Sequence, residues 1–275
     1  MRKKRGMKMV KGLLFFVAFG LGIASKFVIK PSWAKKYDVK WSEKIGIRKL
    51  DLSYGEKKAN KFDLYLPKDD TRKNYGLVVY LHAGGFTSGD KKDDEKTLAW
   101  PTSKGYVAAG INYTLRTETN DASVLSQSYE IKKAIPEVVE QAKKAGYNIN
   151  KMAVAGGSAG HTLAMIYAYR DGKDADVPVV MTYGDGGPSS FHVEDWSKFG
   201  ISRNTDESRK VGAALFTVMS GQMITLEEIQ NQSYLQKVKA IAAEWVKNNP
   251  IPTVVAYGAH DRIQPFAASK RLEKA

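Results

Sequence analysis

Two short stretches after residue 45 alternate apolar and polar residues, and almost wholly apolar runs follow them. The alternating stretches are GIRKLDLSY (46–54) and NKFDLYLP (60–67), a pattern typical of half-buried antiparallel strands. The apolar runs are LVVYLHAG (77–84), YVAAGINY (106–113), KMAVAGG (151–157), VPVVMTYG (177–184) and IPTVVAYG (251–258). Such runs suit parallel strands that are covered on both faces.

Helical patterns separate the apolar runs. One helical face is made of Ile131, Ile135, Val138, Val139 and Ala142. We expect Pro136 to kink or restart this helix, and a second helix to begin at Ser158. The alternation of strands and helices predicts an α/β fold with a doubly wound, mostly parallel sheet.

Residues 185–250 interrupt this alternation. The segment begins with DGGPSSFHVEDW and continues with helical stretches, one of which has a capping box at Thr225 and Glu228. We expect a cap-like insertion that lies over the strand ends, within one domain that spans residues 45–275.

The composition narrows the possible chemistry. The chain has 275 residues, of which 43% are hydrophobic, so it can bury one large core. It has no cysteine, which excludes disulfides, thiolate catalysis and cysteine-based metal sites. We expect neither a metal nor a cofactor.

The formal charge of +14 comes mainly from the N-terminus. Residues 1–36 hold ten of the 43 basic residues and none of the 29 acidic ones, so the other 33 basic residues leave the body at +4. No basic stripe is interleaved with aromatic residues. The sequence therefore disfavours nucleic-acid binding.

Residues 1–30 have the pattern of an export signal. The basic stretch MRKKRGMKMVKG precedes an apolar run of 12 residues, Leu13–Ala24, with Gly22 and Ala24 at positions that a signal peptidase accepts. This run is shorter than the ~20 residues that span a bilayer, although SKFVI extends it. A cleaved signal peptide and an uncleaved membrane anchor both remain open, and both predict a secreted or membrane-anchored, extracytoplasmic body.

The segment GGSAG (156–160) matches the pattern G-x-S-x-G. An apolar run precedes it, and SAGHTLAMIYAYR follows with Leu163, Ile166 and Tyr167 at helical spacing. A strand, a sharp turn and a helix form the setting in which such a serine is a nucleophile, and glycines are needed beside the strained turn. An ordinary glycine-rich turn is the alternative for the motif taken alone.

A second glycine-rich segment, YLHAGGF (80–86), also follows an apolar run. Acyl transfer needs fixed N–H donors for the oxyanion that forms on the substrate carbonyl. Gly84 and Gly85 would supply two such donors, and the amide of Ala159 a third.

Together, HAGGF, GGSAG and YGAHDRIQPF (257–266) resemble the α/β-hydrolase superfamily. The sequence is most similar to its lipase/esterase branch with an HGGG-type oxyanion loop, related to hormone-sensitive lipase. The resemblance covers residues 45–275 and implies the α/β-hydrolase fold, with Ser158 as nucleophile and Asp261 as triad acid. Asp185 is the alternative acid. The family pattern usually has glycine at the positions of Ala83 and His161.

The triad histidine of this family follows the acid, one helix and one strand later. Only fourteen residues follow Asp261 and none is histidine, so we expect the last strand and the histidine to be missing. The four histidines present are His82, His161, His192 and His260. His192 is the least unsuitable replacement, because it lies in the insertion.

Three interpretations stay open. The first is an exported serine esterase for small short-acyl or aryl esters. The second is a catalytically impaired, truncated hydrolase-like protein with a binding role or none. The third is an envelope protein whose basic N-terminus contacts anionic lipids. Without the histidine we expect very weak hydrolysis or none, and the oligomeric state is not predicted.

Overall fold

The computed structural model describes residues 36–238, 242–261 and 263–275. It divides into two compact units, Met1–Val39 and Lys40–Ala275, and the fold below is that of the second. The predicted signal peptide or anchor, residues 1–30, lies outside the described residues. Within the described ranges, no helix combines the length and the apolar character that crossing a bilayer requires.

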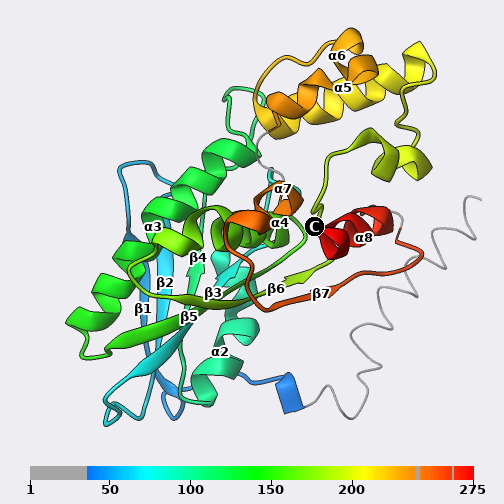
Figure 1. Ribbon diagram of the computed structural model, residues 1–275. Coiled ribbons are helices and arrows are strands. Elements are labelled where there is room, and N and C mark those ends of the chain that lie inside the picture. Colours follow the sequence, from blue (N-terminus) through cyan, green and yellow to red (C-terminus); the bar gives the residue numbers. More distant parts are fainter. Residues whose placement is uncertain (1–35, 239–241, 262) are drawn as a thin grey trace, which may run out of the picture. The chain divides into compact units, whose positions relative to one another are not determined.

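A seven-stranded sheet forms the centre of the second unit, in the order β1-β2-β4-β3-β5-β6-β7 (Figure 1). The strands are β1 (Gly46–Ser53), β2 (Lys61–Pro67), β3 (Tyr75–Leu81), β4 (Val107–Ile111), β5 (Ile149–Gly157), β6 (Val179–Asp185) and β7 (Thr253–Ala256). β2 is antiparallel to both β1 and β4, and all other neighbours are parallel. This arrangement confirms the predicted α/β fold with its mostly parallel sheet.

Helices cover both faces of the sheet. The main ones outside the predicted insertion are α2 (Glu95–Ser103), α3 (Val124–Lys144), α4 (Ala159–Ile166) and α8 (Phe266–Lys274). Shorter turns are η2 (Lys91–Asp94), η3 (Tyr167–Asp171) and η4 (Gly172–Asp174). Leu64 and Leu66 belong to the large core that contains residues of α3 and α4, whereas Tyr65 between them packs with Leu98 of α2. Because side chains alternate along a strand, α2 lies on the opposite face from α3 and α4.

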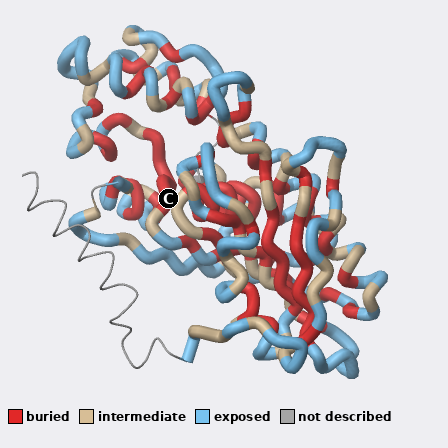
Figure 2. Tube along the Cα trace, turned by 180° about the vertical axis from the view of Figure 1, so that it is seen from behind, coloured by how far each residue is buried: buried red, intermediate tan, exposed pale blue. Residues whose placement is uncertain are grey.

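The core follows the central strands, which are buried along most of their length (Figure 2). All five residues of β4 are buried, as expected for a strand that is covered on both faces. The large core cluster and the smaller cluster under α2 therefore enclose the sheet from two sides.

The helix that contains Pro136 is longer than expected and runs through the proline. α3 begins at Val124, and Ser123 caps it by accepting a hydrogen bond from the Ser126 amide. Pro136 lies on the exposed side of α3. Water can there replace the hydrogen bond that proline cannot donate, so the helix neither stops nor restarts.

The predicted insertion folds mainly into helices. These are η5 (Val193–Phe199), α5 (Asp206–Ser220), α6 (Leu226–Asn231), η6 (Ser233–Gln236), α7 (Ala242–Trp245) and η7 (Val246–Asn248). The capping box at Thr225 and Glu228 is confirmed at the start of α6. A Cβ on Gly221 would lie 2.8 Å from Ser123 Cβ, so the end of α5 adjoins the start of α3.

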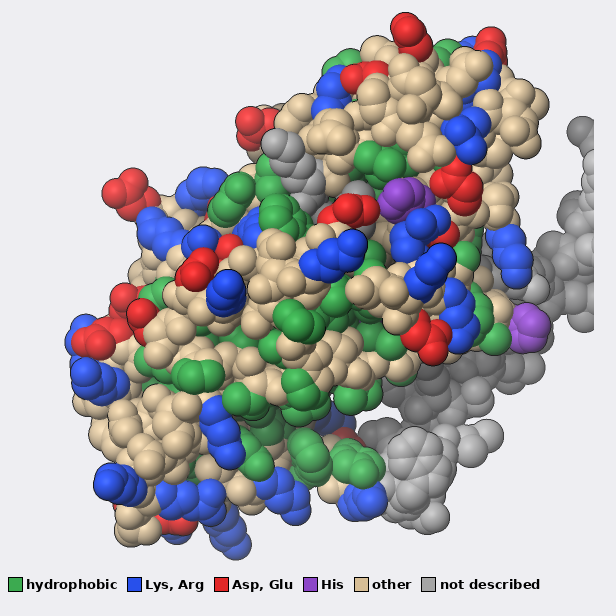
Figure 3. Space-filling view, in the orientation of Figure 1, with side chains coloured by type: hydrophobic (Ala, Val, Ile, Leu, Met, Phe, Trp, Pro, Cys, Tyr) green, Lys and Arg blue, Asp and Glu red, His purple; other side chains and the backbone are tan. Residues whose placement is uncertain are grey.

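β7 is one edge of the described sheet. None of the described strands pairs with its outer side, and the side chains of Val254 and Val255 are 51% and 37% exposed. A groove of about 690 Å³ separates β7 from α8. Apolar side chains gather on the surface over β6 and β7 (Figure 3).

Candidate active site

Ser158 stands on a sharp turn between β5 and α4. Its φ of 49° and ψ of −114° are rare for a residue other than glycine and mark a strained backbone. The Ser158 amide donates to the Asp185 carbonyl at the end of β6, over 2.7 Å. The residue is partly exposed. The turn therefore presents the serine at the end of the parallel strands.

The glycines around Ser158 allow close backbone contact. A Cβ on Gly156 would lie 2.3 Å from the backbone of Gly160. A Cβ on Gly160 would lie 1.9 Å from the Leu81 carbonyl oxygen at the end of β3. Both contacts exclude a side chain, which explains why small residues flank the serine.

The loop after β3, residues 82–89, lies beside this turn. Gly84 has a φ of 129° and Gly85 a φ of 60°, both in the region that favours glycine. The Gly84 carbonyl accepts hydrogen bonds from the amides of Thr87 and Ser88, at 3.1 and 2.9 Å. Neither the Gly84 nor the Gly85 amide donates to any acceptor within the described ranges. Two free donors thus lie in the loop that the sequence predicts to be the oxyanion hole, and Ala159 begins α4 next to Ser158.

His82 supports the base of this loop. Its ring stacks on Tyr113 with 4.3 Å between the ring centres, and its Nδ1 lies 2.7 Å from the Ala83 carbonyl. Burial lowers the pKa of His82, so the ring is neutral at pH 7. The side chain is buried and contacts the backbone of the loop at Ala83.

Asp261 lies in the segment after β7. Its Oδ1 accepts hydrogen bonds from the amides of Ile263 and Gln264, at 2.7 and 3.0 Å. Its Oδ2 would lie 4.0 Å from a Cβ on Gly186, the residue after β6. Gly186 follows Asp185, and the Asp185 carbonyl accepts the hydrogen bond of the Ser158 amide. The Asp261 carboxylate therefore lies at the same end of β6 as the serine turn.

Asp185, the alternative acid, contributes a different group. Its carbonyl fixes the Ser158 amide, as described above. Burial and then the Asp185 carboxylate raise the pKa of Tyr183, so this carboxylate lies near an exposed tyrosine of β6. The contact that the structure shows between Asp185 and the serine turn is therefore made by the Asp185 backbone.

His161 belongs to a buried cluster that the sequence did not indicate. Its Nε2 lies 3.0 Å from the hydroxyl of Tyr257, which donates to the Gly187 carbonyl and lies 2.9 Å from Ser189 Oγ. Burial lowers the pKa of His161 to about 4, so the ring is neutral at pH 7. The cluster joins α4, the segment after β6 and the end of β7.

The two remaining histidines lie in the insertion and after β7. His192 Nε2 lies 3.3 Å from Glu244 Oε1, and His260 is exposed. Among the hydrogen bonds of the described residues, no histidine ring contacts Ser158 or Asp261. The described ranges also contain no group of three His, Asp or Glu side chains arranged to hold a metal ion.

The BD-FAE family model matches residues 62–275. The chain belongs to the BD-FAE family. This is an α/β-hydrolase-like esterase family, so the resemblance to α/β-hydrolase esterases is confirmed.

Curated proteins related to this BD-FAE chain match part of it. Kynurenine formamidase of Danio rerio is 30% identical over 129 residues, which are 46% of this chain and 41% of that protein. Esterase LipI of Mycobacterium tuberculosis is 28% identical over 105 residues, 38% and 32% of the two chains. Ethyl acetate hydrolase of Pseudomonas putida is 30% identical over 104 residues, 37% and 31% of the two chains. The chain thus spans less than half the length of these relatives.

Solved structures share the fold over most of the chain. Esterase B of Lactobacillus rhamnosis has a TM-score of 0.65 at 18% identity, covering 95% of this chain and 80% of its own. A truncated carbohydrate esterase from gut microbiota has a TM-score of 0.64 at 16% identity, covering 85% and 84%. At these identities the likeness shows the fold of the BD-FAE chain.

Asp94, at the start of α2, gives the protein a pH-dependent stability. Its Oδ2 is buried without a hydrogen-bond partner among the described residues. Burial, and then the charge of Asp93, raises the pKa of Asp94 from 3.8 to about 7. An acid whose pKa is higher in the folded state stabilises the fold below its unfolded pKa, and this contribution is lost as the pH rises through the folded pKa.

The test compares the free energy of unfolding of Asp94→Asn with that of the wild type at pH 5 and at pH 8. We expect the difference to change by about 2 kcal/mol in favour of the variant as the pH rises. The amide is uncharged throughout this range. Urea unfolding at both pH values measures the difference. Asp70→Asn, at an exposed carboxylate, is the control and should keep a constant difference from the wild type. A constant difference for Asp94→Asn would contradict the burial of a neutral carboxyl at this position.

Proposed function

We propose that this protein is a serine-dependent carboxylic ester hydrolase with Ser158 as its nucleophile. The observation that carries the proposal is the strained turn at Ser158 beside a loop whose Gly84 and Gly85 amides have no acceptor within the described residues. Strained serine turns and preformed N–H donors are what acyl transfer requires. The esterase family of the chain supports the same reaction class.

In the proposed reaction, Ser158 Oγ attacks the ester carbonyl and transfers its proton to a general base. The carbonyl oxygen becomes an oxyanion, which accepts hydrogen bonds from the amides of Gly84, Gly85 and Ala159. The oxyanion then reforms the carbonyl and expels the alcohol, which takes a proton and leaves an acyl-serine. Water hydrolyses the acyl-serine to the carboxylic acid, and Asp261 orients the base.

The proposed substrates are small esters with short acyl or aryl groups. One relative is named for the hydrolysis of ethyl acetate, and Esterase B has been solved with a tributyrin phosphonate. Both molecules carry short acyl groups. These names support a short-acyl substrate for this chain.

Acylation by p-nitrophenyl acetate tests the nucleophile. This ester needs no general acid, because p-nitrophenolate leaves unprotonated at neutral pH. We expect an acetyl group on the tryptic peptide that contains Ser158, accumulating because deacylation is slow without a positioned base. Mass spectrometry of the digest locates the group, and Ser158→Ala should lose it. Acetylation confined to surface lysines in both proteins would contradict the proposal.

A further inference from the structure

The loop with the free donors holds an unusual backbone over three successive residues. Gly84, Gly85 and Phe86 all have positive φ values, of 129°, 60° and 69°. Glycine adopts such angles easily, but Phe86 is strained there. A strained residue keeps its conformation only when its surroundings hold it. The contacts of Phe86 therefore decide whether the Gly84 and Gly85 amides stay in place.

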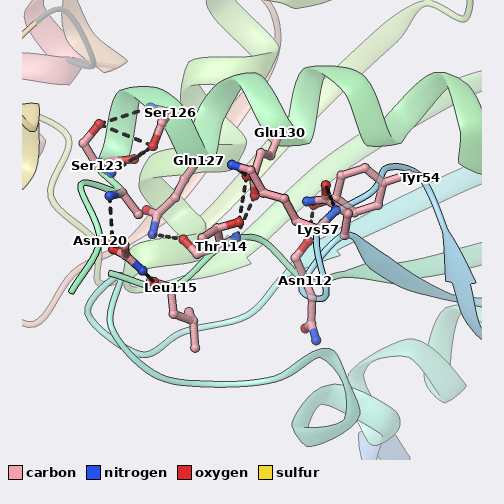
Figure 4. Close-up of polar contacts among 12 residues, drawn as sticks. Tyr54, Lys57, Asn112, Thr114, Leu115, Asn120, Ser123, Ser126, Gln127 and Glu130 are labelled. Atoms are coloured by element: carbon pink, nitrogen blue, oxygen red, sulfur yellow. Dashed lines mark hydrogen bonds and ion pairs between the residues drawn. The ribbon is translucent and has the colours of Figure 1, made fainter. Parts of the chain in front are cut away.

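Two donors converge on the Phe86 carbonyl. The Arg116 amide donates to it over 2.9 Å, and Gln127 Nε2 donates to it over 2.9 Å. Gln127 Nε2 also donates to the Thr114 carbonyl, again over 2.9 Å. One side-chain amide therefore joins the loop after β3 to the segment after β4. Gln127 reaches that segment from α3 (Figure 4).

Contacts of neighbouring residues anchor the part of α3 that contains Gln127. One turn further along α3, Glu130 accepts hydrogen bonds from the amide and the hydroxyl of Thr114, at 2.6 and 2.7 Å. Lys57 pairs with Glu130 at 2.8 Å, and the Ser123 capping box fixes the start of the helix. Figure 4 shows these contacts along one side of α3. The position of Gln127 is thus set by contacts that do not involve the loop.

Only the donor side of the Gln127 side-chain amide makes hydrogen bonds among the described residues. The side chain is fully buried, and its Oε1 has no partner among the described residues. A buried acceptor without a partner is unfavourable, and most buried polar groups avoid it. An apolar side chain of similar size would avoid the cost, but it would leave the Thr114 carbonyl without this donor and the Phe86 carbonyl with the Arg116 amide alone. The two N–H groups are therefore the reason for a glutamine at this position.

We propose that Gln127 is a positioning residue for the oxyanion loop. By holding the Phe86 and Thr114 carbonyls together, it keeps Phe86 in its strained conformation and the Gly84 and Gly85 amides directed toward the site at Ser158. Its effect on catalysis rests on the function proposed above. Its effect on the loop does not.

Hydrogen–deuterium exchange of the full chain tests the effect on the loop. The Thr87 and Ser88 amides, bonded to the Gly84 carbonyl, report whether the loop opens. We expect Gln127→Met to raise exchange in peptide 82–90 by about tenfold or more, because both carbonyls lose a donor. Gln141→Met is the matched control. Gln141 lies on the same helix, but its Nε2 bonds to Glu137 and to no other group among the described residues, so peptide 82–90 should keep its wild-type exchange.

Gln127→Glu adds a test that mere loss of packing does not mimic. A protonated carboxyl donates one hydrogen bond, whereas the carboxylate faces two carbonyl oxygens and repels them. We expect the excess exchange of peptide 82–90, corrected for the chemical rate, to fall as the pH is lowered in this variant. The excess in Gln127→Met should not change with pH. This variant also provides the measurement if Gln127→Met does not fold.

Kinetics separate the two proposals. With p-nitrophenyl acetate and added imidazole, we expect Gln127→Met to lower the Ser158-dependent part of kcat by about tenfold or more with KM within about twofold, since misplaced donors affect the transition state. Unchanged exchange in peptide 82–90 for both Gln127 variants would overturn the positioning role. Increased exchange together with imidazole-stimulated hydrolysis that does not require Ser158 would leave the positioning role standing and contradict the proposed function.

Discussion

Replacing Ser158 by alanine is expected to remove imidazole-stimulated hydrolysis of p-nitrophenyl acetate by this chain and to leave its slow background rate almost unchanged. A serine hydroxyl without a base stays protonated at neutral pH and is a poor nucleophile. The rings of His82, His161 and His192 bond to other groups, and His260 is exposed beside Asp261. Imidazole added to the solution can act as the base, because no described histidine ring bonds to the partly exposed Ser158, which is accessible to it.

The expected rate of hydrolysis depends on which catalytic groups remain beside Ser158. Loss of one triad member commonly removes several orders of magnitude in rate, and binding with the oxyanion hole leaves ~10³–10⁴-fold over water. A positioned general base contributes ~10²–10⁴-fold, so a freely diffusing one should restore about tenfold. The rate is measured against imidazole concentration, and Ser158→Ala corrects for hydrolysis by imidazole alone.

One result would show that this account of the base is wrong. The chain would then hydrolyse the ester at ordinary enzyme rates without imidazole, and Ser158→Ala would stop it. His161, His192 or His260 would have to be the base, and single substitutions would identify it. The contacts of His161 with Tyr257 and of His192 with Glu244 would have to break during turnover.

The strands could be predicted from the sequence because buried strand positions require apolar residues, which form recognisable runs. Each of the seven strands falls within or overlaps a run with the expected pattern, and all of them except β3 match their runs to within two residues at both ends. Helix α3 was predicted less well, because the effect of Pro136 depends on whether water reaches that side of the helix. The strand order β4-β3-β5 depends on contacts between distant segments, and no single run contains it.

The candidate site was predicted as far as its residues lie in local motifs. Ser158, Gly84 and Gly85 belong to turns whose backbone requires small residues, and that requirement is visible in the sequence. Tyr257 contacts a histidine 96 positions away, and no local pattern indicates this contact. The position of Gln127 in the sequence could have indicated its role, but none of the motifs above includes it. It lies one turn before Ile131 on the apolar face of α3, where a polar side chain needs partners.

Replacing Gly160 by alanine is expected to lower the stability of the protein by about 3 kcal/mol, toward the upper end for overpacked sites. The new Cβ would lie 1.9 Å from the carbonyl oxygen of Leu81 and 2.8 Å from that of His82. Both are backbone atoms of the strand and the loop that precede Gly84, so no side chain can move aside. The helix α4 must shift away from β3, and Ser158 shifts with it.

Thermal unfolding followed by circular dichroism measures this loss, which should lower Tm by roughly 6–12 °C for a chain of this size. Gly212→Ala is the matched control, because Gly212 also lies in a helix but the nearest atoms to its Cβ would belong to side chains, Ile201 at 2.9 Å and Ile229 at 3.7 Å. The control should stay within about 1 kcal/mol of the wild type, since alanine favours the helix and the isoleucine can adjust. A wild-type Tm for Gly160→Ala would mean that α4 does not pack against the Leu81 carbonyl. The serine turn and the oxyanion loop would then not lie side by side, and the site as described would lose its geometric basis.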